Sequence, residues 1–251
     1  MRRSLLGSLL VFWCLAGGVG FAGEIAVPNL AGDVLIAETF SHTLKDGTVV
    51  WHEFEAWPRV MWTADTFTMR IEAHPGDTVF LEPGTHDAAV WVFSPGITIT
   101  TAVESETLAQ IRTLEVDADR VTVERIAVGG PQQQNPNRSG HGIEVNRKYL
   151  DRIVIRDCAI ERNDWTGIHI IGASGWIVEM RIENCRIADN GQDGMDSQKM
   201  SRLFVTDCTI TGNGWANAHS VGVRIGTNVE SVVLEGNDIS GNVNEDIIGL
   251  D

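Results

Sequence analysis

The chain has 251 residues, of which 43% are hydrophobic and 21% are charged, values typical of a globular protein with a substantial core. Its formal net charge is −15, and a surface this acidic repels nucleic-acid backbones and anionic lipid headgroups. We therefore expect no nucleic-acid partner. A strongly polyanionic substrate is disfavoured as well, unless a basic patch or a metal ion reverses the local field.

Residues 1–22 have the pattern of a secretory signal peptide. Two arginines precede an apolar stretch from residue 4 to residue 21, and the small residues Gly20 and Ala22 suit cleavage between Ala22 and Gly23. The glycines in this stretch weaken it as a membrane-spanning helix, although a retained anchor is the alternative. We expect a secreted or periplasmic protein with no membrane insertion after cleavage.

Four segments repeat one pattern of apolar residues at alternate positions, Cys or Asn at the sixth position, Ile at the eighth and Asn at the eleventh. These segments are 153–163, 180–190, 203–213 and 232–242. A second recurring strand is led by a glycine, at Gly142, Gly167, Gly194 and Gly222. Alternation with period two predicts strands and excludes a helical repeat. One repeat cannot bury its apolar face alone, so we expect coils of short strands stacked about 4.8 Å apart in parallel register.

Stacking of the coils places equivalent residues on top of one another. The expected ladders are Ile160, Ile187, Ile210 and Ile239 in the core, Cys158, Cys185, Cys208 and Asn237 at a bend, and Asn163, Asn190, Asn213 and Asn242 in a turn. The three cysteines of the repeats are then small buried residues and not a disulfide framework.

This repeat resembles that of the right-handed parallel β-helix proteins of the pectate-lyase-like superfamily. Residues 76–85 (GDTVFLEPGT) resemble the motif with which many such chains open. The resemblance covers residues 76–251 and implies an all-β fold, a right-handed parallel β-helix or solenoid. It leaves the activity open, because the superfamily includes lyases, hydrolases, epimerases and binding proteins.

Residues 23–75 lack the repeat, and we expect them to form an N-terminal cap. The turn Lys45-Asp46-Gly47 between alternating segments predicts a hairpin, which would cover the open end together with Trp51, Trp57 and Trp62. At the other end, a strand at 247–250 is followed by no capping helix. We expect self-association through this uncapped C-terminal end.

In the enzymes that the chain resembles, substrate lies along the outside of the Gly-led strands. Alternation predicts one outward residue per coil on this strand, namely Trp91, Glu115, Glu144, His169, Asp196 and Arg224. Acids, a base and a cation in one line suit the chemistry of polysaccharides. We predict Glu144, His169, Asp196 and Arg224 as catalytic residues. Two mechanisms remain open: hydrolysis by a pair of carboxyl groups, or elimination in which Arg224 neutralises the developing charge.

Two loops border the same strands, 130–140 and 214–220, and sites are often built where loops meet a rigid scaffold. Trp91, Glu115, Trp165 and Trp215 are therefore predicted to bind substrate, the tryptophans by stacking on sugar rings. The alternative is a non-catalytic module that binds glycan or a cell-envelope partner. The outward residues of the next strand are also largely charged, and such a column needs no function beyond solvating that face of the solenoid (Glu124, Arg156, Glu183, Thr206 and Glu235). A charged row is therefore also compatible with a module that has no catalytic activity.

Asp164 and Asp193 precede Gly-led strands in adjacent coils, and with Asp196 they form a candidate Ca²⁺ site. Asp is also an ordinary turn residue, so the protein is expected to need no cofactor other than this possible Ca²⁺. A transition-metal site at His141, His169 and His219 is a weaker alternative. Gly140-His141-Gly142 resembles the GHG motif of polygalacturonase-like hydrolases, but the paired Asp-Asp of that family is absent from the preceding coil. No catalytic set carries over from a known family.

Overall fold

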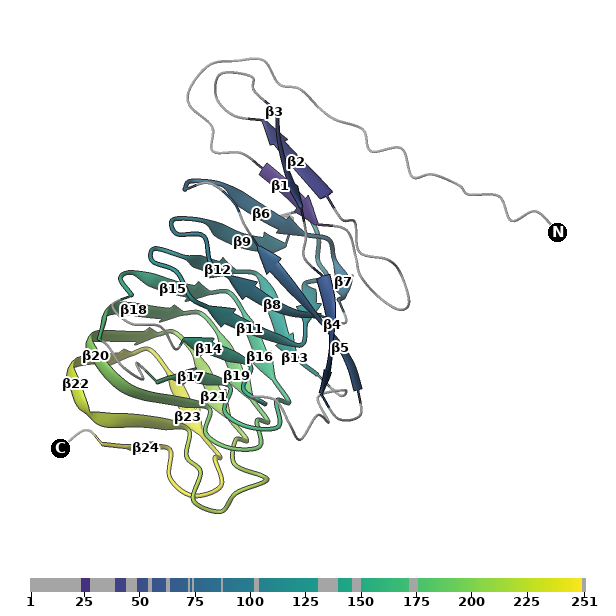
Figure 1. Ribbon diagram of the computed structural model, residues 1–251. Helices are drawn as coiled ribbons and strands as arrows, with labels where there is room; N and C mark the ends of the chain where they lie inside the picture. Colours follow the sequence, from purple (N-terminus) through teal and green to yellow (C-terminus); the bar gives the residue numbers. More distant parts are fainter. Residues whose placement is uncertain are drawn as a thin grey trace.

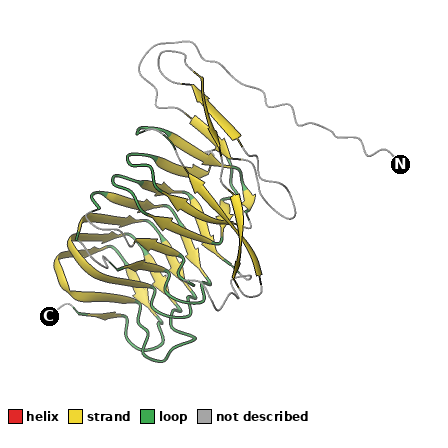
Figure 2. Ribbon diagram, in the orientation of Figure 1, coloured by secondary structure: helices red, strands yellow, loops and turns green. Residues whose placement is uncertain are grey.

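The computed structural model describes residues 24–27, 39–43, 49–53, 56–61, 64–71, 73, 75–86, 88–101, 104–130, 140–145, 150–171 and 176–249, with side chains from Ile71 onward. The predicted signal peptide, the turn at 45–47, and Trp62 lie outside these residues. The described residues form strands and turns without a helix (Figure 2). Within them, no helix could span a membrane.

Successive coils stack into a solenoid with three parallel sheets, which confirms the predicted all-β solenoid (Figure 1). Sheet 1 contains β5 (Ala64–Ile71), β8 (Ala88–Val92), β11 (Thr113–Val116), β14 (Ile143–Val145), β17 (Ile168–Ile170), the first parts of β20 (Met195–Thr206) and β22 (Val223–Glu235), and β24 (Ile247–Ile248). Sheet 2 contains β1 (Glu24–Val27), β6 (Thr78–Leu81), β9 (Thr98–Thr101), β12 (Thr122–Glu124), β15 (Ile153–Arg156), β18 (Ile177–Glu183) and the last parts of β20 and β22. Sheet 3 contains β7 (Gly84–Thr85), β10 (Ala109–Ile111), β13 (Ile126–Gly129), β16 (Ala159–Glu161), β19 (Arg186–Ala188), β21 (Thr209–Thr211) and β23 (Asp238–Ser240).

Sheets 1 and 2 become continuous toward the C-terminus, because β20 and β22 each run through both of them. A register shift between β20 and β22 after Ser197 marks the corner between the two sheets. Asp196 on sheet 1 and Thr206 on sheet 2 therefore belong to one strand, β20.

The predicted N-terminal hairpin is present, since β2 (Thr39–Thr43) pairs antiparallel with β3 (Val49–Glu53). Figure 1 shows it beyond β1 and β6, at the N-terminal end of the solenoid. A second hairpin was not expected: β4 (Ala56–Met61) pairs antiparallel with β5, and β5 pairs parallel with β8. Because β1 also pairs parallel with β6, the sheets extend to residues N-terminal of the repeat seen in the sequence.

The interior contains the predicted aliphatic and cysteine ladders. Ile160, Ile187 and Ile210 are fully buried and lie in register with one another, and Ile210 pairs with the half-buried Ile239. The three cysteines, Cys158, Cys185 and Cys208, are buried and unbridged. Residues with positive φ make the bend from sheet 2 to sheet 3 in successive coils: Arg125, Asp157, Asn184, Asp207 and Gly236. Asn, Asp and Gly tolerate this conformation best, which explains their place before each cysteine-ladder position.

The asparagine ladder forms as predicted. The Nδ2 atoms of Asn163 and Asn190 donate to the Oδ1 atoms of Asn190 and Asn213 at 2.8 and 2.9 Å, and Asn213 continues to Asn242 at 2.9 Å. Each Oδ1 also accepts the backbone N–H of the preceding rung at 3.1 Å. The ladder therefore satisfies buried backbone donors as well as its own amides.

The last coil covers its apolar side chains less completely than the others. Val232, Leu234, Ile239 and Ile247 pack against the core but are only partly buried. The association of subunits through this end stays a prediction.

Candidate functional site

The outward residues of sheet 1 lie in consecutive register, as alternation predicted. Trp91 is opposite Glu115, which is opposite Glu144. Glu144 is opposite His169, followed by Asp196 and Arg224. We call these six residues the outward row. Each is half-buried, and successive members are one strand spacing apart, about 4.8 Å.

A glycine before each of β14, β17, β20 and β22 sets the position of the C-terminal part of this row. A Cβ on Gly167 would lie 2.6 Å from the carbonyl oxygen of Gly194 and 2.7 Å from Asn190 Nδ2. The same close approach recurs at Gly142, Gly194 and Gly222. Because these glycines pack closely against the asparagine ladder, the four strands begin at the same height in their coils.

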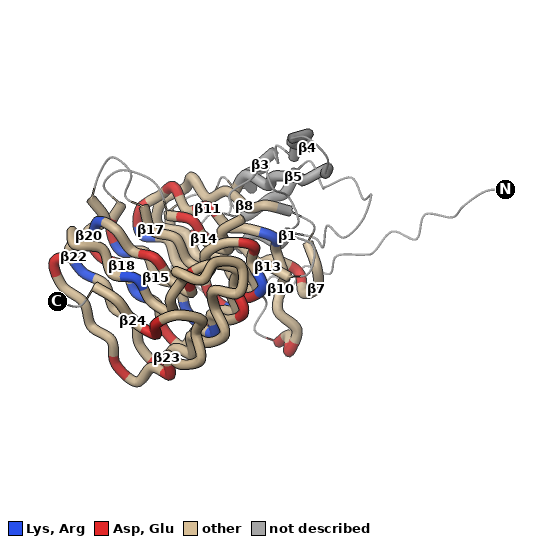
Figure 3. The backbone as a smooth tube through the Cα atoms, turned by 90° about the horizontal axis from the view of Figure 1, so that it is seen from below, with Lys and Arg blue, Asp and Glu red and all other residues tan. Residues whose placement is uncertain are grey.

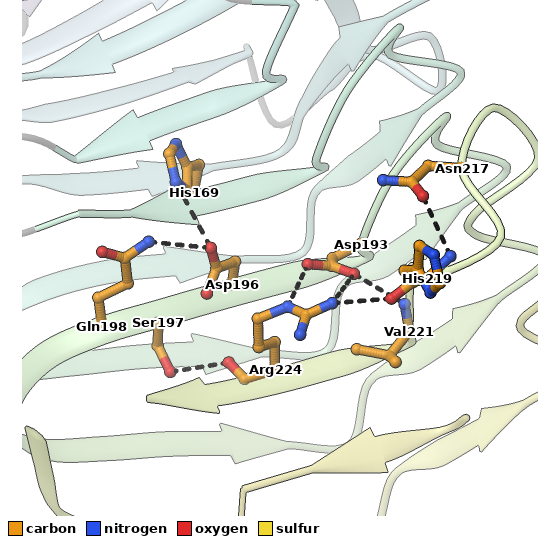
Figure 4. Close-up of polar contacts among 9 residues, drawn as sticks. All are labelled: His169, Asp193, Asp196, Ser197, Gln198, Asn217, His219, Val221 and Arg224. Carbon is orange, nitrogen blue, oxygen red and sulfur yellow. Dashed lines mark hydrogen bonds and ion pairs between the residues drawn. The ribbon is translucent and has the colours of Figure 1, made fainter. Parts of the chain in front are cut away.

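His169 and Asp196 face each other at the centre of the row (Figure 4). His169 Nε2 lies 3.6 Å from Asp196 Oδ2, and both side chains are only 13% exposed. Gln198 Nε2 donates to the same carboxylate oxygen at 3.2 Å. His169 Nδ1 and Asp196 Oδ1 are buried and have no hydrogen-bond partner within the described part of the chain. Unpaired buried polar atoms are uncommon in folded proteins, and a catalytic role is one explanation among several. This feature alone does not define the site, because such atoms are also found in His86, His141 and Asn163.

His141 packs against this pair from the preceding coil. Its ring centroid lies 3.9 Å from that of His169, with a tilt of 32°, and the edge of Trp165 approaches it at 5.1 Å. The pKa of His141 is lowered to about 3, mainly by burial and then by His169, against the opposing effects of Asp196 and a hydrogen bond with the Thr166 backbone. His141 is therefore neutral near pH 7. His141 was not among the predicted catalytic residues, although it lies in the Gly-His-Gly motif.

Arg224 is not open to substrate in the way predicted. Its Nε donates to Asp193 Oδ2 at 2.7 Å, and its Nη2 donates to Asp193 Oδ1 at 3.1 Å and to the His219 carbonyl at 3.0 Å (Figure 4). Asp193 Oδ1 also accepts the Val221 N–H at 2.7 Å. We call this arrangement the Asp193–Arg224 clasp. The hydrogen bond with Asp193 raises the pKa of Arg224, and the clasp fixes the end of the 214–220 loop.

The proposed metal ligands do not form a metal site. In the described ranges, no group of three or more His, Cys, Asp or Glu residues could hold a metal ion. Both oxygens of Asp193 are used by the clasp, and burial raises the pKa of Asp164, which favours its neutral form. The Ca²⁺ requirement stays a prediction without support from this geometry.

Two of the predicted substrate-binding tryptophans lie exposed on turns that are two coils apart, with the turn at 191–193 between them. Trp165 is 37% exposed and Trp215 is 61% exposed. Backbone hydrogen bonds stack their turns: Gln192 N donates to the Trp165 carbonyl, and Ala216 N donates to the Gly191 carbonyl. Trp215 is held by its Nε1, which donates to the Asp189 carbonyl at 2.9 Å. Trp91, in contrast, is half-buried and packs edge-on against Phe93 at 5.5 Å.

On the outward face of sheet 2, charges of opposite sign pair with each other. Arg156 Nε donates to Glu124 at 2.6 Å, and Glu179 binds both Arg181 and Arg202, at 2.9 and 3.0 Å. Acidic and basic segments accordingly alternate along β15, β18, β20 and β22 (Figure 3). This face has the balanced charge expected of a solvated surface.

Comparison with known proteins gives one match. Residues 141–250 match the family model described as "Right handed beta helix region". The matched segment includes His141, Glu144, His169, Asp196 and Arg224. No curated protein and no solved structure matches the chain.

Proposed function

We propose that this chain, a right-handed parallel β-helix repeat protein, is a secreted or periplasmic protein that acts on a polysaccharide at the outward row of sheet 1. The observation that carries the proposal is the group formed by Glu144, His169 and Asp196 in three consecutive coils, with His169 Nε2 3.6 Å from Asp196 Oδ2. The signal-like N-terminus and the acidic surface support action outside the cytoplasm.

The arrangement suits acid–base chemistry at a glycosidic bond. Asp196 can orient the His169 imidazole, so that His169 donates a proton to a leaving oxygen. Glu144 lies on the other side of His169, one strand spacing away, about 4.8 Å between backbones. Glu144 is therefore the carboxylate that would assist the attack of water.

Elimination has less support. It requires a positive group to neutralise the substrate carboxylate while a base removes the neighbouring proton. The cation predicted for that role, Arg224, is already bound to Asp193 through two hydrogen bonds. We therefore favour hydrolysis.

A non-catalytic glycan-binding module is the second candidate, and the two exposed tryptophans favour it. Trp165 and Trp215 are exposed, and stacking on sugar rings requires no reaction. Catalysis should depend on His169, whereas glycan binding without a reaction should not. The His169 side chain is only 13% exposed and so offers little surface for stacking on a sugar ring.

The test is a screen of the purified protein against plant, algal and bacterial polysaccharides, with and without EDTA. Release of reducing ends measures hydrolysis, and ultraviolet absorbance of unsaturated products measures elimination. His169→Ala should lower turnover by roughly a hundredfold or more, the usual contribution of a general acid or base. Thr206→Ala is the control, because Thr206 lies on β20, the strand of Asp196, but faces outward from sheet 2.

An unchanged rate in His169→Ala would contradict the proposed role of His169. Glycan binding without turnover in the wild-type protein would establish the binding module instead. Loss of activity in EDTA would show that a metal ion takes part, which the geometry of the described residues does not support.

A further inference from the structure

We infer that the site selects uncharged glycans and rejects polyanionic ones, because the Asp193–Arg224 clasp neutralises the cation of the outward row. The inference rests on the proposed function and adds the substrate class to it. It also gives Asp193 a role that the sequence did not suggest, that of a residue that determines specificity.

The first argument is the charge of the row. Between Trp91 and Arg224 the row holds four residues, three carboxylates and one histidine, at successive strand spacings. A bound polyuronate would place its own carboxylates along this line of like charge. The net charge of −15 adds a repulsive long-range field.

The second argument is the geometry of the clasp. Asp193 is only 6% exposed, and its two oxygens receive three hydrogen bonds, one from Val221 N and two from Arg224. The Arg224 side chain is 34% exposed, so an anionic sugar can approach it, but its charge is already balanced by this buried carboxylate. Drawing the guanidinium away from Asp193 would be costly, since the buried carboxylate would be left without compensation.

The third argument is the character of the surroundings. His141, with a pKa of about 3, supplies no positive charge near neutral pH. Trp165 and Trp215 present aromatic surface instead, which suits the apolar faces of neutral sugar rings.

The experiment compares neutral and anionic oligosaccharides of matched length. Neutral probes are xylo-, manno-, cello- and laminari-oligosaccharides and methyl-esterified oligogalacturonate, and anionic probes are oligogalacturonate, oligoalginate and hyaluronan fragments. Binding is followed by calorimetry and by tryptophan fluorescence at low and high salt. The tightest neutral probe should bind at least roughly tenfold more tightly than the tightest anionic probe at low salt. High salt should narrow the difference, because it screens the repulsion.

The variant Asp193→Asn tests the clasp directly. The amide keeps an oxygen to accept the Val221 N–H, but it is neutral and releases the Arg224 guanidinium. Affinity for oligogalacturonate should rise roughly tenfold, and the double variant Asp193→Asn, Arg224→Gln should lose that gain. Glu124→Gln is the matched control: it also removes one negative charge beside an arginine, but on sheet 2, and it should give no comparable gain.

Three outcomes would overturn the inference. An anionic glycan that binds the wild-type protein as tightly as any neutral one contradicts the selectivity. Equal gains in Asp193→Asn and Glu124→Gln assign the effect to overall charge and not to the clasp. No gain in a folded Asp193→Asn protein, with a melting temperature near that of wild type, contradicts the role of Asp193. Absence of binding to any glycan of either class would instead overturn the proposed function itself.

Discussion

The imidazole rings of His141 and His169 stack with their centroids 3.9 Å apart, although 28 residues separate them in the chain. His141 lies immediately before Gly142, and His169 lies two residues after Gly167 in the next coil. Asp193 and Arg224 have the same relationship to Gly194 and Gly222. In both pairs, the residue before a glycine reaches diagonally to the outward residue of the following coil.

Replacement of His141 should change how stability depends on pH. The folded protein holds the pKa of His141 at about 3, below the ordinary value of 6.5, so the unfolded chain binds more protons between these values. Stability contributed by the neutral imidazole is therefore complete above about pH 6.5 and is lost as pH falls toward 3. Each unit of difference corresponds to about 1.4 kcal/mol, so acidification to about pH 4 should cost about 3–4 kcal/mol through this residue.

The measurement is the free energy of unfolding in urea across this pH range for wild type and His141→Phe. Phenylalanine keeps an aromatic ring against His169 and cannot take up a proton, so its pH dependence should be shallower. His219→Gln is the control, because His219 is exposed and its contact with Arg224 uses only its backbone carbonyl. Parallel pH profiles for wild type and His141→Phe would refute the assignment.

Removal of an internal rung of the asparagine ladder should destabilise the solenoid strongly. Asn190 is fully buried, and its side chain bonds the backbone N–H and the amide of Asn163, the Asn213 oxygen and the Ile160 carbonyl. Asn190→Ala leaves several of these groups buried and unpaired, at about 1–3 kcal/mol each. We expect a loss of at least about 3 kcal/mol in the free energy of unfolding, measured by urea denaturation.

Asn242 provides the comparison for this prediction. It makes equivalent bonds to Asn213 and to the Ile210 carbonyl, but it is only half-buried, so water can replace part of what is lost. Asn242→Ala should therefore cost about half as much as Asn190→Ala or less. Equal losses at the two positions would mean that burial does not set the strength of the ladder.

The repeat was sufficient to predict the fold and the outward row, for a physical reason. In a solenoid, equivalent positions become neighbours, so an alignment of repeats is also a map of contacts. The vertical pairs Glu144 with His169 and His169 with Asp196 followed from alternation alone. The asparagine and isoleucine ladders followed in the same way.

Diagonal contacts were not predictable from that alignment. Whether Arg224 extends toward substrate or back toward Asp193 depends on the rotamer of a long side chain, and alternation gives only the face of the sheet. The catalytic role predicted for Arg224 therefore stays a prediction, while its position in the row is as predicted. The strand β5 and the hairpin with β4 were missed because residues 56–71 carry no copy of the repeat.

The glycines that lead β14, β17, β20 and β22 should tolerate no side chain. The sequence showed that these glycines recur, and the structure shows the steric reason. A Cβ on Gly194 would lie 2.6 Å from the Gly222 carbonyl oxygen, 2.7 Å from Ile210 Cγ2 and 2.8 Å from Asn213 Nδ2. Two of these atoms belong to the ladders, so Gly194→Ala cannot be accommodated without moving adjacent coils. We expect a loss of at least about 3 kcal/mol in the free energy of unfolding, comparable to severe overpacking of a core.

The control for this variant is Gly241→Ala. A Cβ there would meet no atom within 4 Å, but φ is +65°, so the cost comes from backbone strain alone, about 1 kcal/mol. Urea denaturation of both variants separates steric conflict from strain. If Gly194→Ala were no more destabilised than Gly241→Ala, the coils would have to be free to shift, and neither the ladder nor the spacing of the outward row could be as fixed as the contacts indicate.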